Sequence, residues 1–310
     1  MKNNNEIWYC VMNPTAGKRD HTKVWKEIQN KLVEQQVQFE VYFTKAKKDA
    51  ESFVIGKVEE GYRKFIAIGG DGTVHEIVNG IMKQEVVASN QLTLAVIPVG
   101  TGNDWAKHHN ITFDMDKLCA SLKQEITDVQ DMGLASFSNN GVYKHEYFNN
   151  VAGMAYDAFV VEQLEKRTGK PNKLIYIFSV LSLLFKYKLQ KASVKFDNSE
   201  KTGKFYTINV GICKYSGGGM SMVPHALHSD GLLALTLAGQ LKKIDVLLNT
   251  YRFYNESLLQ HPKIDSYQVK ELEVTSMDDN PIALELDGEM AGHNPVRFSI
   301  VEKGLRFVKM

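Results

Sequence analysis

Hydrophobic positions in the first 131 residues alternate between short apolar runs and amphipathic stretches. Short apolar runs are typical of strands buried in a parallel sheet, and apolar residues three or four positions apart are typical of helices. Strands are therefore predicted at residues 6–12, 39–44, 64–68 and 92–98, and helices at residues 22–36, 47–61 and 73–83. This alternation predicts an α/β domain with a parallel sheet built from right-handed βαβ units.

The pattern changes after residue 131, where strand-like segments follow one another with turn-rich connections. Two helical stretches, 172–189 and 241–259, interrupt this series. The strand candidates are residues 143–151, 192–196, 204–213, 232–238, 264–276, 282–286 and 296–301. A second domain with a mainly antiparallel sheet is therefore expected.

Composition and charge narrow the possible functions. The chain has 310 residues, and its 37 Lys and Arg against 36 Asp and Glu give a formal net charge of +1. A chain so close to neutral has no overall field that would attract nucleic acid, so we expect no nucleic-acid partner. The three cysteines, which lie among apolar residues without a CxxC pair, indicate buried reduced thiols in a cytoplasmic protein.

The longest apolar run, residues 174–185, has 12 residues. Such a run is too short to span a bilayer, and the N-terminus lacks the long apolar stretch of a signal peptide. Lysines flank the run at positions 173, 186 and 188, which suits either a buried helix or a helix at a lipid interface. Because only Ser179 and Ser182 are polar within it, a buried helix is the favoured interpretation.

Glycine-rich loops follow three of the predicted strands of the first domain. They are residues 13–18 (Asn-Pro-Thr-Ala-Gly-Lys), 69–73 (Gly-Gly-Asp-Gly-Thr) and 100–104 (Gly-Thr-Gly-Asn-Asp). In open α/β sheets ligands bind where the strands end at their carboxyl edge. Glycine lets backbone N–H groups approach a bulky anion, and a following helix adds its positive end. The three loops together therefore predict a nucleotide phosphate site.

The loops differ in how specific they are. Taken alone, the first is usually just a turn, and a Gly-x-Gly pair such as that of the third occurs in many proteins. The second loop places the Asp71 carboxylate between glycines directly after an apolar strand, where it can reach a phosphate-bound Mg²⁺. The chain contains neither the GxxxxGK[ST] spacing nor the dinucleotide pattern GxGxxG, which disfavours those two phosphate sites.

In this order and at this spacing, the three loops resemble the diacylglycerol kinase catalytic family, in particular the soluble bacterial lipid kinases. The resemblance continues to Asp287-Gly288-Glu289 and covers nearly the whole chain. It implies an N-terminal Rossmann-like domain of the NAD kinase and diacylglycerol kinase type, followed by an antiparallel β-sandwich. It also implies that a last strand at 304–308 returns to the first domain, which would comprise residues 1–131 and 302–310, with residues 132–301 as the lipid domain.

By this resemblance, the nucleotide and its metal would lie on the first domain. Asp71 would be the essential aspartate linked through Mg²⁺ to the phosphates of ATP. Asp104 and Asp131 resemble two further acidic positions near that metal, and Lys173 resembles the lysine that pairs with them, although alone it would be a solvated flanking charge. The implied nucleotide-binding residues are Asn13, Thr44, Gly69, Gly70, Gly72, Thr73, Gly100 and Thr101.

The resemblance further implies a second metal loop around Asp230. Asp230 would give its carboxylate, and Leu227 and Leu232 their main-chain oxygens, a set of ligands that suits Mg²⁺ or Ca²⁺. From the sequence alone, Ser-Asp-Gly at this point is a hairpin turn. Ser229 replaces an acidic residue that is often found there, which leaves the strength of this site open.

The implied reaction is phosphoryl transfer, in which positioning and charge neutralisation dominate. Glu289, from the second domain, would accept the proton of a lipid hydroxyl, and as a turn carboxylate it would otherwise be merely solvated. Diacylglycerol is the expected acceptor, but phosphatidylglycerol, sphingoid bases and undecaprenol-like alcohols present similar hydroxyls. Binding at the inner membrane surface is expected to be peripheral and transient, without a transmembrane segment, and a homodimer is left open.

Two alternatives remain. NAD kinases share Gly-Gly-Asp-Gly-Thr, but the Asn-Glu pair expected for their second adenosine is not found in this chain. A nucleotide-sensing protein without catalysis is disfavoured because every candidate catalytic carboxylate is present.

Overall fold

The computed structural model describes residues 4–139, 141–166 and 182–310, and the chain divides into two compact units. The first unit comprises Met1–Met132 and Glu302–Met310, and the second comprises Gly133–Val301. Two long strands, β5 (Thr127–Asn139) and β17 (Glu289–Val308), carry the chain from one unit to the other.

The first unit is an α/β layer structure with a parallel sheet in the order β17-β4-β3-β1-β2. Its strands are β1 (Trp8–Met12), β2 (Phe39–Phe43), β3 (Lys64–Gly69) and β4 (Thr93–Pro98), joined by the end of β17. Its helices are α1 (His21–Glu34), α2 (Asp49–Glu59), α3 (Asp71–Lys83), α4 (Asp104–His108) and α5 (Met115–Gln124), with 3₁₀ turns η1 (Asn4–Glu6) and η2 (Ser89–Gln91). The end of β17 pairs with β4 through Arg306 opposite Thr93.

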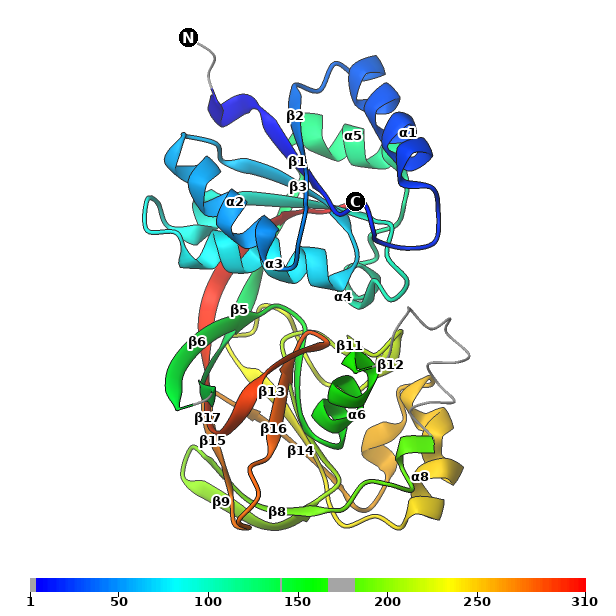
Figure 1. Ribbon diagram of the computed structural model, residues 1–310, viewed down its shortest axis with the longest axis vertical. Coiled ribbons are helices and arrows are strands. Elements are labelled where there is room, and N and C mark those ends of the chain that lie inside the picture. Colours follow the sequence, from blue (N-terminus) through cyan, green and yellow to red (C-terminus); the bar gives the residue numbers. More distant parts are fainter. Residues whose placement is uncertain (1–3, 140, 167–181) are drawn as a thin grey trace. The chain divides into compact units, whose positions relative to one another are not determined.

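Helices cover both faces of this sheet, with α1 and α5 on one face and α2 and α3 on the other (Figure 1). Alternate residues of β1 show why. Trp8, Cys10 and Met12 pack in the cluster with α1 and α5, whereas the Tyr9 ring lies 5.0 Å from Phe53 of α2. A strand buried on both faces is apolar throughout, as β1 is.

The second unit is a mainly antiparallel β-sandwich, which confirms the expected fold class. One run of strands has the order β14-β13-β10-β7-β16-β17, β15 joins β17 to β8 and β9, and β5 pairs with β6. Its strands are β6 (Val142–Phe148), β7 (Val151–Ala155), β8 (Gln190–Phe196), β9 (Ser199–Phe205), β10 (Thr207–Gly211), β11 (Tyr215–Ser216), β12 (Met220–Ser221), β13 (Leu233–Ala238), β14 (Ile264–Val269), β15 (Glu271–Ser276) and β16 (Ala283–Leu286). Its helical segments are α6 (Tyr156–Glu165), α8 (Lys243–Asn249), η3 (Thr250–Phe253) and η4 (Leu258–Gln260).

Several predicted elements are divided in the structure. The expected strand 143–151 is two strands, β6 and β7, because the Asp287 carboxylate binds the backbone N–H groups of Asn149 and Asn150 between them. The expected strands 204–213 and 264–276 are likewise interrupted, at Tyr206 and Lys270.

The helical predictions also need correction. The expected helix 241–259 is shorter and continues as 3₁₀ turns, because the Asn249 and Thr250 side chains bond to backbone carbonyls one turn earlier. Helices α5 and α6 were not predicted, and the predicted helix 172–189 lies largely outside the described residues. All three cysteines are buried and free, as expected.

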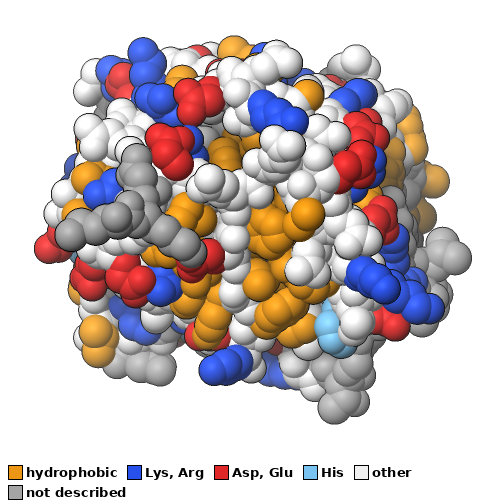
Figure 2. All heavy atoms as spheres, turned by 90° about the horizontal axis from the view of Figure 1, so that it is seen from above, with side chains coloured by type: hydrophobic (Ala, Val, Ile, Leu, Met, Phe, Trp, Pro, Cys, Tyr) orange, Lys and Arg blue, Asp and Glu red, His pale blue; other side chains and the backbone are white. Residues whose placement is uncertain are grey.

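Charged side chains of the first unit are mixed in sign. Arg19 pairs with Glu27 at 2.7 Å, and Lys64 pairs with both Glu6 and Glu125. On the face shown in Figure 2, positive and negative side chains alternate around a centre where hydrophobic side chains gather. Opposite charges are therefore neighbours on this face, and exposed ion pairs of this kind contribute little stability.

Candidate functional site

The three glycine-rich loops of the first unit meet at one edge of its sheet. The loop after β1 is joined to β3 by the Asn13 N–H, which donates to the Ile68 carbonyl at 3.0 Å. The loop after β4 is joined to β3 by the Val99 N–H, which donates to the Gly69 carbonyl at 2.9 Å. Because the strands are parallel, all three loops follow carboxyl ends, where ligands of α/β sheets bind.

These loops approach one another so closely at two places that only glycine fits. A Cβ added at Gly100 would lie 2.4 Å from the Cα of Gly70. Gly17, in the first loop, has a φ of +71°, and a Cβ there would lie 2.0 Å from the Val99 carbonyl oxygen. These contacts are with backbone atoms, which cannot turn aside as a side chain can. The glycines therefore bring backbone N–H groups from separate loops to one place, as an anion site requires.

Asp71, in the second loop, is the first residue of α3, and its carboxylate contacts the third loop. Its Oδ1 accepts a hydrogen bond from the Trp105 N–H at 3.2 Å. A Cβ at Gly102 would lie 2.9 Å from Oδ2 of Asp71 and 3.7 Å from Oδ2 of Asp104. Two carboxylates thus border the space that Gly102 leaves open, and Asp104 is buried at 4% exposure. Clustered carboxylate oxygens suit Mg²⁺, so these residues fit the expected metal.

The other residues of the first unit that are expected to bind the nucleotide differ in their contacts and exposure. The Asn13 side chain accepts from the N–H and the hydroxyl of Thr15, both at 2.9 Å, and so closes its own loop. The N–H of Thr44 donates to the Met12 carbonyl at 2.9 Å, which holds Thr44 next to the first loop. Thr73 is buried beneath Gly69, and Thr101 is exposed at the tip of the third loop.

Asp131 has a structural contact that the sequence did not reveal. It is 1% exposed, and its Oδ1 accepts from the Lys303 N–H at 2.6 Å. Lys303 has a φ of 52°, so this bond holds an unusual backbone position where β17 enters the first unit. A role for Asp131 near the metal stays a prediction, and Lys173, its expected partner, lies outside the described residues.

Glu289 follows a two-residue turn between β16 and β17, in the second unit. Asp287 and Gly288 have φ values of 51° and 88°, the left-handed conformations that such tight hairpins need. The Asp287 carboxylate accepts from the backbone N–H groups of Asn149, Asn150 and Val151 at 2.9 to 3.1 Å. These bonds hold the turn that precedes this partly exposed glutamate, and the role of Glu289 as a base stays a prediction.

The Asp230 loop has the geometry of a turn. Oδ1 of Asp230 accepts from the Leu232 N–H at 3.1 Å, and Oδ2 accepts from the Gln268 side chain at 3.0 Å. Gly231 has a φ of 75°, and Leu227 is 58% exposed. These hydrogen bonds account for the shape of the loop without an ion, so the second metal site also stays a prediction.

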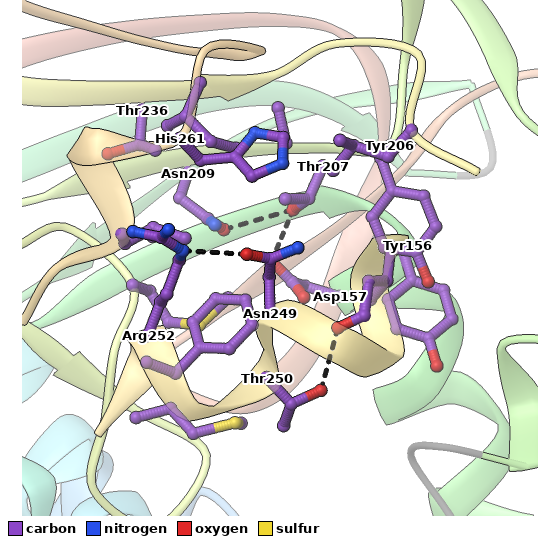
Figure 3. Close-up of a pocket in the computed structure, with 18 of the residues that line it drawn as sticks. Tyr156, Asp157, Tyr206, Thr207, Asn209, Thr236, Asn249, Thr250, Arg252 and His261 are labelled. Carbon is purple, nitrogen blue, oxygen red and sulfur yellow. Dashed lines mark hydrogen bonds between the residues drawn. The ribbon is translucent and has the colours of Figure 1, made fainter. Parts of the chain in front are cut away.

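A partly open pocket lies within the second unit (Figure 3). Its walls come from α6, β10, β13, α8 and η3, and most of them are apolar or aromatic. They include Tyr156, Leu184, Tyr206, Met220, Met222, Ala238, Leu241, Val246, Phe253, Leu258 and Ile264. The sequence did not indicate which residues line this pocket, because they come from segments far apart in the chain.

Polar groups gather at one part of this pocket. The Thr207 hydroxyl lies 2.5 Å from Oδ2 of Asp157 and 3.4 Å from Oδ1 of Asn209, and Figure 3 shows the three side chains together. Burial raises the pKa of Asp157 to about 6, and its hydrogen bonds only partly oppose this. Asp157 is the second residue of α6, which directly follows β7, and the sequence did not single it out.

A second acidic group faces Asp157 across Gly153. Glu285 is 2% exposed, and its Oε2 accepts from the Gly288 N–H at 2.7 Å. A Cβ at Gly153 would lie 2.3 Å from Oε1 of Glu285 and 2.9 Å from the Cβ of Asp157. Both carboxylates line a smaller hollow, which shares Asp157, Asn209, Met220 and Met222 with the larger pocket.

Taken together, one unit has the features of a nucleotide-phosphate site and the other has space for a largely apolar ligand. Comparison with known proteins identifies the family to which a chain with these two sites belongs. Residues 8–135 match the diacylglycerol kinase catalytic domain family, and residues 150–309 match the YegS C-terminal NAD kinase beta sandwich-like domain. The chain belongs to the diacylglycerol kinase family of lipid kinases.

Individual relatives agree with this assignment. The chain is 25% identical to a diacylglycerol kinase of Staphylococcus saprophyticus, over 93% of this chain and 90% of that protein. It is 26% identical to a Xanthomonas euvesicatoria protein named "Probable lipid kinase YegS-like", over 96% and 94%. The fold matches the crystal structure of a diacylglycerol kinase from Bacillus anthracis with a TM-score of 0.73, 20% identity and coverage of 99% and 97%.

No helix within the described residues is both long and apolar enough to cross a membrane.

Proposed function

We propose that this protein transfers the γ-phosphoryl group of ATP to the hydroxyl of a membrane lipid, and that its acceptor is diacylglycerol, which becomes phosphatidic acid. The observation that carries the proposal is the meeting of the three glycine-rich loops around Asp71. Phosphoryl transfer needs mainly positioning and neutralisation of phosphate charge, and this edge offers backbone N–H groups and carboxylates for both.

The first unit would bind the nucleotide. Backbone groups of residues 69–73 and 100–101 would hold the phosphates, with Asn13 and Thr44 beside them. Asp71 and Asp104 would hold Mg²⁺, which when bound would neutralise charge on the phosphates. The start of α3, whose preceding residue is Gly70, adds the positive end of a helix dipole to the same place.

The second unit would bind the acceptor. The apolar walls of the pocket in Figure 3 suit acyl chains, and its polar part suits a headgroup with hydroxyls. Glu289 would take the proton of the attacking hydroxyl, and the bonds that hold Asp287 would keep Glu289 in a fixed place. Nucleophilic attack of the lipid oxygen then forms the new P–O bond while the bond to ADP breaks.

The direct test is incubation with radiolabelled ATP and Mg²⁺ and a panel of acceptors: diacylglycerol, phosphatidylglycerol, sphingosine, undecaprenol and NAD. We expect label mainly in diacylglycerol. Label in another lipid would show that diacylglycerol is not the acceptor, while the proposed lipid kinase activity would stand. Formation of NADP would make the protein an NAD kinase, and no label in any acceptor would favour nucleotide sensing.

Asp71→Asn tests the nucleotide site within that assay. Removing one charge from the metal-linked carboxylate should lower turnover by about 10²- to 10³-fold and weaken Mg²⁺-dependent ATP binding. Asp116→Asn is a matched control, because Asp116 is an exposed aspartate on α5 that pairs only with Lys31 among the described residues. Equal rates for the two variants would contradict the assignment of Asp71.

A further inference from the structure

One helical segment of the second unit exposes large hydrophobic side chains to solvent. Ile244 is 55% exposed, Leu248 is 68% exposed and Tyr251 is 55% exposed. They follow one another at spacings of four and three residues along α8 and η3, so they share one side of the helical segment. We call these three residues the α8 outer face.

The opposite side of the same segment lines the pocket described above. Val246, Asn249, Thr250 and Phe253 all belong to the lining, and Figure 3 shows Asn249 and Thr250 on the pocket side. A segment in a soluble protein usually buries its apolar side and exposes polar residues. Here both sides carry apolar residues, and one of them has no covering layer among the described residues.

Basic residues adjoin the start of the outer face. Lys242 and Lys243 precede Ile244 and are exposed. The Lys243 ammonium donates to the Phe185 carbonyl at 2.6 Å and lies 5.9 Å from that ring, which is 62% exposed. This contact places Phe185 and the exposed Lys186 beside the helix start, so the apolar surface continues with a positive border.

We propose that the α8 outer face inserts into the interfacial layer of a bilayer that contains anionic phospholipid. Exposed aliphatic and aromatic side chains bordered by lysines are the composition of an interfacial helix. Anionic headgroups would attract Lys186 and Lys242, and the acyl boundary would receive Leu248 and its neighbours. The proposal rests on the proposed function in one respect, that the pocket on the other side of the segment takes a membrane lipid.

This arrangement would give the lipid a short path. An acceptor in the bilayer would lie on one side of α8, and its binding pocket on the other. The acyl chains would therefore not need to cross water over a long distance, which is the main energetic barrier to extracting a lipid.

Vesicle binding of Leu248→Asp is the first test. The probe is sedimentation with vesicles of phosphatidylglycerol and phosphatidylcholine in equal amounts. We expect binding to fall by about tenfold or more, because the variant loses the transfer of one leucine and adds a charge that anionic lipid repels. Val33→Asp is the matched control, since Val33 is 62% exposed on α1 of the other unit, and it should bind like the natural protein.

The positive border is tested by Lys186→Gln together with Lys242→Gln. Their effect should be clear with phosphatidylglycerol at low salt, and should vanish with pure phosphatidylcholine or at high salt. Leu248→Trp gives an independent reading that does not rely on lost binding. Its fluorescence should be quenched by phospholipids brominated on the acyl chains, and Val33→Trp should not be quenched.

Two results would overturn the proposal. One is vesicle binding by Leu248→Asp that equals the control when both variants show the same thermal unfolding. The other is a dimer of the natural protein, seen by sedimentation equilibrium, that Leu248→Asp converts to monomers without loss of vesicle binding. In that case the α8 outer face would contact a second copy of the chain and not the bilayer. A third result separates this proposal from the proposed function. If vesicle binding depends on Leu248 but no lipid is phosphorylated, the proposed function fails while the membrane contact stands.

Discussion

The candidate site of the first unit is made mainly of backbone atoms, whereas that of the second unit is made mainly of side chains. In the first unit the site consists largely of backbone, and glycines permit loops to approach within distances that no side chain would allow, as at Gly70 and Gly100. In the second unit the pocket consists of side chains on strands and helices, and the buried carboxylate of Asp157 is among them. Phosphate is the same in every nucleotide and can be recognised by backbone N–H groups, whereas an acceptor must be distinguished by side chains.

The largest effect on activity is expected from a substitution in the second unit that should leave the nucleotide site of the first unit intact. Glu289→Gln keeps the shape and hydrogen bonding of the side chain but removes its basicity, so turnover should fall by about 10²- to 10⁴-fold. ATP affinity should stay nearly constant, because the proposed nucleotide site lies on the first unit. The measurement is the kinase rate at saturating ATP and lipid, with nucleotide affinity measured alongside.

Near-normal turnover in Glu289→Gln would leave the transfer without a dedicated base. A large loss of ATP affinity would instead contradict the proposal that the first unit binds the nucleotide and the second unit binds the acceptor.

Gly100→Ala tests whether the first unit depends on close backbone contact. Its new methyl group would meet the Cα of Gly70 at 2.4 Å, and overpacking of this kind costs about 1–3 kcal/mol. We expect a loss of ATP affinity of about tenfold, measured by titration calorimetry, because each 1.4 kcal/mol is a factor of ten. Thermal unfolding should show a matching loss of stability.

Gly56→Ala is the control for that experiment. Gly56 lies in α2, and a Cβ there would meet nothing within 4 Å. Alanine should raise stability by about 0.5–1 kcal/mol through its helix propensity and leave ATP affinity unchanged. Similar behaviour of the two variants would contradict the importance of the loop contact.

Asp157→Asn tests the acidic group of the second unit through pH. The folded pKa of Asp157 is raised from 3.8 to about 6, so the folded protein binds this proton more tightly than the unfolded chain. That stabilisation is present below pH 3.8 and is lost as the pH rises through 6. Between pH 4 and pH 7 the natural protein should lose about 1–3 kcal/mol of unfolding free energy relative to Asp157→Asn.

Urea unfolding of both proteins across this pH range is the measurement. If the two curves run parallel, Asp157 titrates near its ordinary pKa and the pocket is wetter than its lining suggests.

The smallest effect is expected at the Asp230 turn. Asp230→Ala removes two hydrogen bonds of an exposed side chain, which should cost about 1 kcal/mol of stability. If the turn binds a metal, Mg²⁺ should raise the melting temperature of the natural protein but not of the variant. A loss of melting temperature that is the same with and without Mg²⁺ would leave the residue as part of an ordinary turn.

The sequence by itself determined the class of fold and the glycine-rich loops. The alternation of apolar strands and amphipathic helices is a local pattern, because residues that face one core recur at the period of the element they form. The three loops directly follow strands of one parallel sheet, so chain order alone indicated that Asn13, Gly69 and Gly100 would lie at the same edge. Membership of the diacylglycerol kinase family agrees with both predictions.

Only the tertiary structure decided which distant residues meet. Asp131 holds the backbone of Lys303, 172 positions later, and Asp287 holds the segment that starts at Asn149. Helix α8 has a pocket on one side and exposed apolar residues on the other, which its own sequence could not distinguish because both sides are partly hydrophobic. Hydrophobic periodicity records that a residue is apolar but not what covers it, and that depends on segments which the chain brings together only when it folds.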